Sequence, residues 1–382
     1  MQVSQQPASA SEFAAALGAA NAAGHRVELG GNFTKHRWAG PIEPADVRIE
    51  TVKLNRVIEY EPRDLTISVE AGMPYAELTK LLAANRQMVP LDPPYAATAT
   101  VGGVLAANHS GPRRRLFGTA RDLVIGMSFA TMEGKLVQAG GMVVKNVAGL
   151  DMAKLLIGSW GTLAAITSVN FKLIPKDKFT RTFLQSFDSA AAALEERNRI
   201  LTSVLQPAAI DLLNPAASAR IGRTGWLLAI GAGGSQALVD RYSRELASAE
   251  PLEGDTERAF WHSVETFAER FLDEHSGGAI VRVSSALRDL AQAVSSHNGP
   301  AVARAANGVA SLFHQTAPKS LPAPAGFWPS QGSQSIMEAG PAGRSPAGMW
   351  PESGSEFPVM EKIKNMMDPR HLLNKGRLYG RI

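Results

Sequence analysis

The sequence predicts an α+β protein of two domains, and three observations support this fold class. Between Asp92 and Ser168, glycines recur among small polar residues at the ends of successive predicted strands. Beyond Pro175, predicted strands and helices follow one another in an order typical of an antiparallel sheet with helices on one face. Residues 315–349 are rich in Pro, Gly, Ser and Ala with little periodicity, which is typical of a long flexible connection. The predicted parts are a first domain (1–175), an α+β cap (176–314), a flexible linker (315–349) and a C-terminal segment (350–382).

Composition excludes several classes of protein. The 382 residues, 45% hydrophobic and 19% charged, are ordinary for a soluble globular protein. There is no apolar run of the roughly 18 residues that a transmembrane helix needs, and the first residues lack the pattern of a signal peptide. Because the chain has no Cys, disulfides and thiolate zinc sites are excluded, and any iron–sulfur cluster must sit on a partner. The net charge of +4 with scattered basic residues argues against nucleic-acid binding.

The first domain opens with a predicted helix, strand and glycine loop. Residues 11–23 are Ala-rich, with Ser11 as the predicted N-cap and Gly24 as the predicted end of the helix. A strand at 26–29 is followed by a loop of six residues: Gly30, Gly31, Asn32, Phe33, Thr34 and Lys35. Glycine lets backbone N–H groups approach an anion, so this order can form an anion cradle. Taken alone, a β-turn that ends the strand explains the loop equally well.

A second glycine segment follows a predicted strand at 65–69 and a helix opened by Pro74. Residues 102–108 are the predicted start of a short helix whose N–H groups point at a ligand. Thr100, Asn108 and Ser110 add hydroxyl and amide donors beside it. For the three successive Arg at 113–115, a solvated loop is favoured over neutralisation of phosphate.

A third glycine segment closes the domain. Residues 122–139 predict a hairpin with its turn at Glu133 and Gly134. A helix at 151–157, the glycine segment at 158–162 and a strand at 165–173 follow. The three segments together favour a ligand cradle over a turn-rich sheet whose glycines serve only tight corners.

The cap contains four predicted strands, at 181–187, 209–213, 226–230 and 279–284. Its predicted helices lie at 189–205, 235–249, 257–271 and 286–295. A last helix at 356–367 precedes residues 368–378, which we call the closing segment.

The glycine segments carry a family resemblance. Residues 100–103 (TVGG), 107–111 (ANHSG) and 156–162 (LIGSWGT) resemble the flavin-cradling segments of FAD-binding domains of the vanillyl-alcohol oxidase and p-cresol methylhydroxylase type. Within that superfamily the chain most resembles the FAD-binding subunits of bacterial glycolate oxidases. The resemblance covers residues 10–175 and the closing segment. It departs from the family at Asn32, where a third glycine is usual, and at Lys375, where Pro is usual.

The resemblance implies a domain of two α+β subdomains that binds FAD non-covalently, with the first loop around the diphosphate. Ile166 would meet the cofactor through its backbone. The implied cofactor residues are Gly30, Gly31, Asn32, Phe33, Thr34, Lys35, Thr100, Gly102, Gly103, Asn108, His109, Ser110, Gly111, Gly118, Gly158, Gly161, Thr162 and Ile166.

No catalytic residue is evident in the cap. Relatives that oxidise 2-hydroxy acids carry a His-rich, Gly-Asp-Gly-Asn-like metal segment there, whereas His262 and His275 lack acidic partners in a matching pattern. None of the eight His lies four residues from another, so we expect no metal site. His109, inside the second cradle segment, either packs on the flavin or covers it.

The resemblance implies a degenerate cap and an FAD-binding subunit of a multi-subunit glycolate dehydrogenase, which oxidises glycolate to glyoxylate. The implied partners are a paralogous FAD-linked subunit that bears the 2-hydroxy-acid site and an iron–sulfur subunit. The implied location is cytoplasmic, with a peripheral place at the inner membrane through those partners as an option. Two alternatives stay open: a free-standing FAD-linked oxidase of another alcohol or 2-hydroxy acid, and a non-catalytic assembly subunit with a vestigial flavin pocket.

Overall fold

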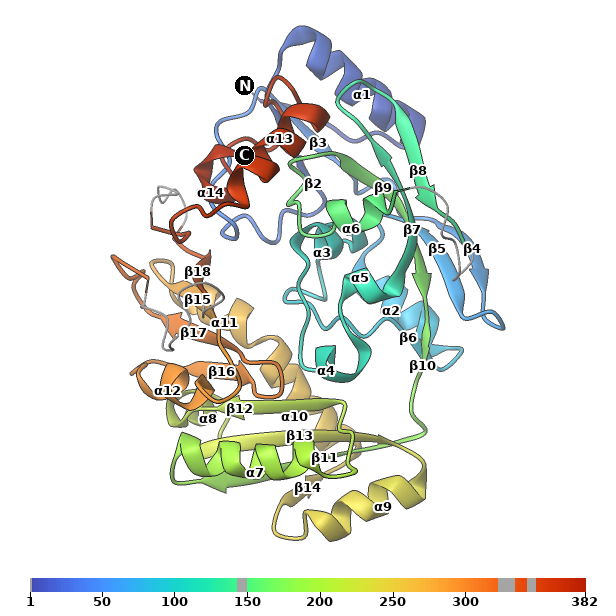
Figure 1. Cartoon of the computed structure of the whole chain (residues 1–382). Coiled ribbons are helices and arrows are strands. Elements are labelled where there is room, and N and C mark those ends of the chain that lie inside the picture. The colour runs from blue at the N-terminus through green and yellow to red at the C-terminus, as the bar shows by residue number, and fades with distance from the viewer. Residues whose placement is uncertain (1, 143–149, 322–333, 342–347) are drawn as a thin grey trace.

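The computed structural model describes residues 2–142, 150–321, 334–341 and 348–382. The N-terminal domain and the C-terminal helices form one half of the molecule and the cap forms the other (Figure 1).

The first domain consists of two α+β subdomains. A three-stranded parallel sheet has the order β1-β3-β2, and a five-stranded antiparallel sheet has the order β4-β5-β9-β7-β8. The elements of the smaller subdomain are β1 (Val3–Gln5), α1 (Ala10–Ala23), β2 (Val27–Gly30) and β3 (Val47–Glu50). Those of the larger one are β4 (Val57–Glu61), β5 (Thr66–Glu70), α2 (Tyr75–Ala83), β6 (Gln87–Met88), α3 (Val101–Ala107), α4 (Arg114–Phe117), α5 (Ala120–Leu123), β7 (Val124–Ala130), β8 (Leu136–Gly140), α6 (Met152–Leu156), β9 (Ala165–Lys172) and β10 (Ile174–Pro175).

Local chemistry explains where these helices begin and end. The N-cap of α1 is Ser9, whose hydroxyl accepts from Glu12 N–H, so the predicted cap at Ser11 is wrong by two positions. Gly24 ends the helix in the left-handed conformation, as predicted. Thr100 caps α3 and Asp151 caps α6, each through its side-chain oxygen. These caps place a hydroxyl and a carboxylate beside two of the glycine segments.

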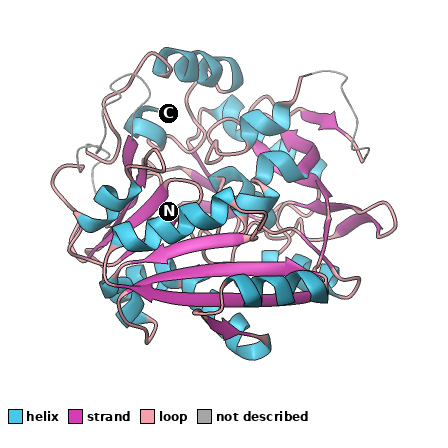
Figure 2. Cartoon of the chain, turned by 60° about the horizontal axis from the view of Figure 1, so that its bottom comes forward, coloured by secondary structure: helices cyan, strands magenta, loops and turns pink. Residues whose placement is uncertain are grey.

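The cap is built on an eight-stranded antiparallel sheet with the order β14-β11-β13-β12-β16-β17-β15-β18. Figure 2, in which this part comes forward, shows its long strands and the helices over them. Its elements are β11 (Phe179–Phe187), α7 (Ala190–Thr202), β12 (Ala209–Leu213), α8 (Pro215–Arg220), β13 (Trp226–Gly234), α9 (Gln236–Glu245), β14 (Glu250–Leu252), α10 (Gly254–Glu265), α11 (Phe267–Glu274), β15 (Ala279–Ser284), α12 (Leu290–Ser295), β16 (Ala301–Arg304), β17 (Val309–His314) and β18 (Gln334–Ala339).

Helices cover both faces of this sheet, and not one face as the sequence predicts. The helices α7, α9 and α12 pack with Phe183 and Leu228 on one face, while α8, α10 and α11 pack with Leu184 and Leu227 on the other. The reason is that neighbouring positions along each strand are both apolar, so both faces of the sheet must be covered. The second cluster includes Trp38 of the first domain, so it also joins the two domains.

Two further differences concern the second half of the chain. The predicted helix at 257–271 is two helices, because Thr266 separates α10 from α11. The predicted linker contains β18, whose alternate residues Ser335, Met337 and Ala339 are buried. Pairing with β15 orders this strand, although its surroundings are rich in Pro, Gly and Ser. The remaining linker lies partly outside the described residues.

The C-terminal segment returns to the first domain. It contains α13 (Phe357–Met367) and the short α14 (Leu378–Arg381). Leu373 forms an isolated parallel bridge with Val27, and Val27 N–H donates to Leu372 O at 2.8 Å. The closing segment therefore extends the smaller sheet beside β2.

Candidate functional site

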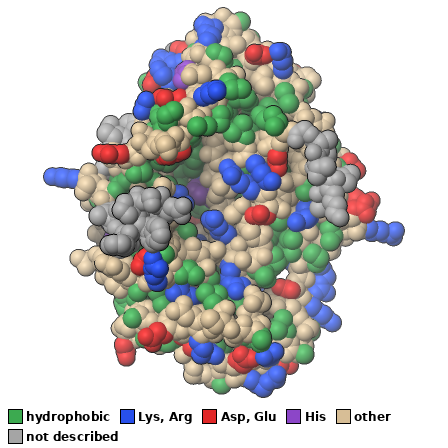
Figure 3. Space-filling model, viewed as in Figure 1, with side chains coloured by type: hydrophobic (Ala, Val, Ile, Leu, Met, Phe, Trp, Pro, Cys, Tyr) green, Lys and Arg blue, Asp and Glu red, His purple; other side chains and the backbone are tan. Residues whose placement is uncertain are grey.

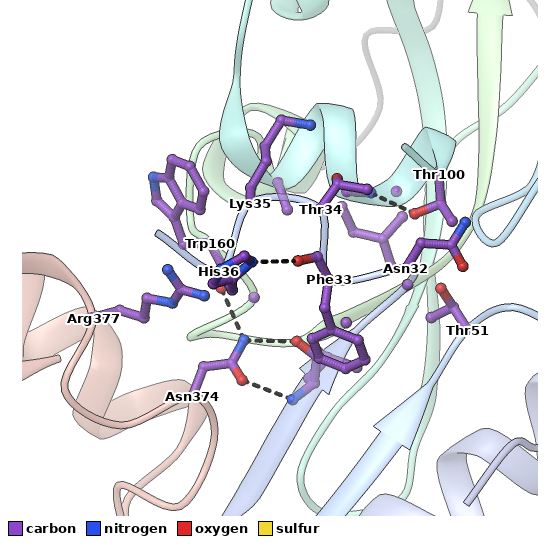
Figure 4. A pocket seen from close by; sticks show the side chains of 18 of the residues that line it. Asn32, Phe33, Thr34, Lys35, His36, Thr51, Thr100, Trp160, Asn374 and Arg377 are labelled. Atoms are coloured by element: carbon purple, nitrogen blue, oxygen red, sulfur yellow. Dashed lines mark hydrogen bonds between the residues drawn. The ribbon is translucent and has the colours of Figure 1, made fainter. Parts of the chain in front are cut away.

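The candidate site is a hollow of about 760 Å³, counted with its open side, in the first domain (Figure 4). Most of its lining comes from the loop after β2, the start of α3, the loop after α6 and the closing segment, and Thr51 after β3 and Ile166 of β9 complete it. Its lining residues are Leu29, Gly30, Gly31, Asn32, Phe33, Thr34, Lys35, His36, Thr51, Thr100, Gly102, Gly103, Ala106, Trp160, Gly161, Ala164, Ile166, Asn374 and Arg377.

The first two glycine segments touch each other. A Cβ added to Gly31 would lie 2.3 Å from Thr100 Oγ1, so only glycine fits between the loop and the start of α3. Asn32 Nδ2 donates to Thr98 O at 2.7 Å, which ties the loop to the same region. Gly103 differs, because a Cβ there would meet only Thr100 Oγ1, at 3.1 Å. Gly31 is thus required by the packing of the loop against Thr100, whereas the absence of a side chain at Gly103 leaves space beside the hollow.

Asn374 joins the third glycine segment to the closing segment. Its Oδ1 accepts from Leu29 N–H at 2.7 Å, and its Nδ2 donates to Leu29 O at 3.1 Å and to Trp160 O at 2.9 Å. The dashed lines of Figure 4 mark bonds of this network. A single amide therefore positions the end of β2 and the backbone beside Gly161.

Two buried cations line the hollow. Lys35 is 8% exposed, and within the described chain its Nζ has no hydrogen-bond partner. Burial lowers the pKa of Lys35 to about 8, against the opposing influence of Glu269. Arg377 donates from Nη1 to Gly40 O at 3.0 Å and to Trp38 O, while its Nε has no partner among the described atoms. Burial lowers the pKa of Arg377 to about 10, which still leaves it charged at neutral pH.

His109 lies just beside this wall. Its ring centroid is 4.5 Å from that of Trp38 and 5.7 Å from that of Trp160, both edge-on. Burial, followed by the charges of Lys35 and Arg282, lowers the pKa of His109 well below its usual value, so the imidazole is neutral. Its Nδ1 has no hydrogen-bond partner in the described structure.

Eleven of the predicted cofactor residues line the hollow: Gly30, Gly31, Asn32, Phe33, Thr34, Lys35, Thr100, Gly102, Gly103, Gly161 and Ile166. The other seven lie outside its lining: Asn108, His109, Ser110, Gly111, Gly118, Gly158 and Thr162.

Several of these seven have structural reasons for their identity. A Cβ at Gly111 would lie 2.6 Å from Asp92 O, so this glycine serves packing. Gly118 ends α4 against the Asp122 carboxylate, and the Thr162 hydroxyl donates to Ser159 O at 2.7 Å. Gly111, Gly118 and Thr162 therefore stabilise turns near the hollow, although their own atoms do not line it.

Eight lining residues are additional to the predicted set: Leu29, His36, Thr51, Ala106, Trp160, Ala164, Asn374 and Arg377. Trp160 lies inside the third glycine segment, and Asn374 and Arg377 lie inside the closing segment, so the sequence carried a signal for these three. Ala106 likewise lies inside the predicted helix start at 102–108, whereas Thr51 carries no such signal, because only the folding of β3 brings it to the hollow.

The three successive Arg form neither a solvated loop nor part of the hollow. Arg113 Nε lies 3.0 Å from Asp92 Oδ2, and Arg115 Nη1 donates to Pro207 O of the cap at 2.8 Å. Arg114 begins α4. The solvated-loop prediction is therefore wrong, because a buried carboxylate 21 residues away and the cap backbone hold these side chains.

Charged groups also meet where the cap faces the first domain. Burial raises the pKa of Asp211, which pairs with Arg304, to about 6, and burial next to Asp92 raises that of Glu265 to about 7. Figure 3 shows Lys and Arg side chains around a hollow in the middle of the displayed face.

Within the described residues, no group of three or more His, Asp and Glu could hold a metal ion. The described helices include none that is both long and apolar enough to cross a bilayer.

The residues present fit a flavin dinucleotide. A glycine loop beside two buried cations suits a diphosphate. Lys35 Nζ and Arg377 Nε have no acceptor in the described structure, and the oxygens of a ligand could supply one. The aromatic wall at Trp160 and the room beside Gly103 suit a flat ring system. The hollow also has hydroxyl donors at Thr34 and Thr100.

Comparisons with known sequences agree with this fit. Residues 2–140 match the family model described as FAD binding domain. Glycolate oxidase subunit GlcE of Escherichia coli (strain K12) is 38% identical over 123 residues, which are 32% of this chain and 35% of that protein. Glycolate oxidase subunit GlcD of Bacillus subtilis (strain 168) is 30% identical over 161 residues, 42% of this chain and 34% of that protein. The matches thus span about a third of the length of these relatives.

Solved structures show a similar fold over nearly the full length of the chain. p-Cresol methylhydroxylase with substrate bound superposes with a TM-score of 0.74 at 13% identity, over 99% of this chain and 88% of that one. Alkyldihydroxyacetonephosphate synthase superposes with a TM-score of 0.68 at 18% identity, over 97% of this chain and 75% of that one. The predicted α+β fold class is confirmed, and the match of residues 2–140 to the FAD binding domain model agrees with the predicted cofactor.

Proposed function

We propose that this chain, which carries an FAD-binding domain of the p-cresol methylhydroxylase type, is the FAD-binding subunit of a multi-subunit glycolate dehydrogenase. It would bind FAD non-covalently and take part in the oxidation of a 2-hydroxy acid, glycolate to glyoxylate. Its partners would be a paralogous FAD-linked subunit and an iron–sulfur subunit. In such a complex the chain would lie in the cytoplasm and meet the inner membrane through its partners.

One observation carries the cofactor assignment. The hollow is walled by glycine segments, and two of its lining residues, Lys35 and Arg377, have buried nitrogens that lack an acceptor in the described structure. Buried donors without partners are rare in folded proteins, so a ligand that supplies acceptors explains them. The matching family model covers the first loop and the second glycine segment.

The chain's own residues would hold and orient the cofactor. The backbone of residues 30–35 and the hydroxyls of Thr34 and Thr100 would hold the diphosphate region, and Asn374 would fix the loops around it. When bound, FAD supplies a ring that accepts a hydride from the carbon bearing the hydroxyl. The protein would exclude water from the ring through Trp160, which lines the hollow.

The lining of the hollow supports a reaction that this chain shares with a partner subunit, and not one that it catalyses alone. Hydride removal from a hydroxy acid needs a base for the hydroxyl proton and a group that holds the carboxylate. No carboxylate lines the described hollow; its lining histidine, His36, is exposed and contacts Phe33 O, and the neutral His109 lies outside the lining. The relatives GlcD and GlcE are both named subunits of glycolate oxidase, which supports a partner that completes the site. The absence of Cys supports a separate iron–sulfur subunit.

The test is to purify the chain alone and record its visible spectrum. We expect flavin absorption, and acid precipitation should release all of the yellow colour into the supernatant. Colour kept in the pellet would show a covalent bond, and a colourless chain that takes up no added FAD would contradict the cofactor assignment. Mixing the chain with the two proposed partners should then give glycolate-dependent reduction of a dye.

A further inference from the structure

Lys35 and Arg377 share an unusual environment. Both side chains are buried, at 8% and 7% exposure, and both line the same hollow (Figure 4). Neither forms an ion pair with a carboxylate in the described structure, although the chain contains many surface ion pairs. A buried cation without a counter-ion is costly, and such groups are usually paired or serve a site.

The two cations come from distant parts of the chain. Lys35 ends the first glycine loop, and Arg377 belongs to the closing segment. Arg377 is held by Trp38 O and Gly40 O, and its guanidinium carbon lies 5.6 Å from the ring centroid of Trp160. These contacts fix the Arg377 side chain without neutralising its charge.

We infer that Lys35 and Arg377 together supply the counter-charge for the diphosphate of FAD. The inference rests on the proposed function and assigns charge neutralisation to two named side chains. At neutral pH the anionic part of oxidised FAD is its diphosphate, whereas the ring is uncharged. Two buried cations among the residues that line one hollow therefore match the diphosphate in sign and number.

If Lys35 supplies this charge, its surroundings have a consequence for the pH dependence of binding. Burial depresses its pKa to about 8, while Glu269 of α11 opposes this and the neighbouring His109 is neutral. A dianion beside the ammonium favours its charged form and raises that pKa. Above about pH 8, ligand binding must then add a proton to Lys35. The affinity should fall with rising pH, by up to tenfold per pH unit, because the ligand prefers the protonated side chain.

The experiment compares ADP, FAD and riboflavin as ligands of the full chain by titration calorimetry. ADP carries the diphosphate without the flavin, and riboflavin carries the ring without phosphate. We expect Lys35→Met and Arg377→Met each to weaken ADP and FAD binding by about 10- to 100-fold, the usual effect of losing a charge-assisted hydrogen bond. Riboflavin binding should change by less than about threefold. Lys375→Met is the matched control, because Lys375 pairs with Glu43 and does not line the hollow.

Proton uptake is measured at pH 8.5 in two buffers of different ionisation enthalpy. The parent chain should take up a proton with ADP, and Lys35→Arg should bind ADP with near-parent affinity but take up none, since Arg stays charged. Thermal unfolding of each ligand-free variant shows whether it folds. Unchanged ADP affinity in folded Lys35→Met, or an equal loss of riboflavin binding, would overturn the inference and leave the FAD assignment standing. A parent chain that binds none of the three ligands would overturn both.

Discussion

The ammonium of Lys364 lies 2.7 Å from Oδ2 of Asp368, and both side chains are completely buried. Lys364 also donates to Thr162 O at 2.7 Å and to Leu373 O at 3.0 Å, while Leu373 N–H donates to Asp368 Oδ2 at 2.8 Å. The pair thus fastens the closing segment to the loop after α6. Burial lowers the pKa of Lys364, and Asp368 counteracts that effect.

Breaking this pair should destabilise the protein and weaken cofactor binding. Lys364→Met leaves the Asp368 carboxylate buried without its partner, so we expect a loss of about 3–5 kcal/mol in the free energy of unfolding. Urea unfolding measures the loss, and FAD titration should show weaker binding, because Asn374 lies in the fastened segment. Lys362→Met, on the exposed side of the same helix, is the control. Equal stabilities of the two variants would show that the pair contributes nothing.

Two adjacent glycines should respond differently to substitution. A Cβ at Gly102 would lie 3.0 Å from Ala71 O and 2.9 Å from its Cβ, so Gly102→Ala should cost about 1–3 kcal/mol of stability. Gly103→Val points instead into the hollow and should keep a native circular dichroism spectrum while losing bound FAD. Full FAD content in Gly103→Val would contradict the placement of the cofactor beside α3.

Glu265 should make stability fall as the pH rises. Burial, and then the nearby Asp92, raise its folded-state pKa to about 7, whereas an unfolded Glu titrates near 4.3. The folded state therefore binds more protons between these values, so the free energy of unfolding decreases as the pH rises through this window. Glu265→Gln should flatten that part of the profile in urea unfolding at pH 5, 6 and 7. Glu274→Gln, at an exposed ion pair, is the control. An unchanged slope in Glu265→Gln would refute the assignment.

The chain alone should turn over glycolate and D-lactate poorly. A missing general base typically costs about 10²–10⁴-fold in rate, and the described hollow offers no carboxylate and no buried histidine for this role. An assay with FAD and an artificial dye acceptor should show at least about 100-fold more activity once the two proposed partners are added. Robust turnover by the pure chain would favour a free-standing oxidase.

The elements with strong local signals could be predicted from the sequence. The helix ended by Gly24 has its predicted C-terminus, and the strands β12 and β15 have their predicted bounds, because caps and short apolar runs are local features. The loop at 30–35 was recognisable for the same reason. β18 was missed because its order depends on pairing with β15 across the cap.

Long-range contacts account for most of what the sequence could not show at the site. In the sequence, Arg113 is one of three successive basic residues in a predicted loop. Only the fold places the Asp92 carboxylate against its guanidinium. The contacts of Asn374 are with residues 345 and 214 positions away, so no local pattern reveals them. The unpartnered state of Lys35 is likewise a property of the packed structure and not of its neighbours in sequence.

The distance along the chain between Leu29 and Asn374 has a consequence for biosynthesis. A ribosome releases the first glycine loop long before the residues that complete the wall, since the two lie 345 positions apart. The first domain of a nascent chain therefore lacks Asn374 and Arg377 and cannot yet present the whole hollow. A complete lining for the proposed cofactor therefore exists only after the cap and the closing segment have been translated.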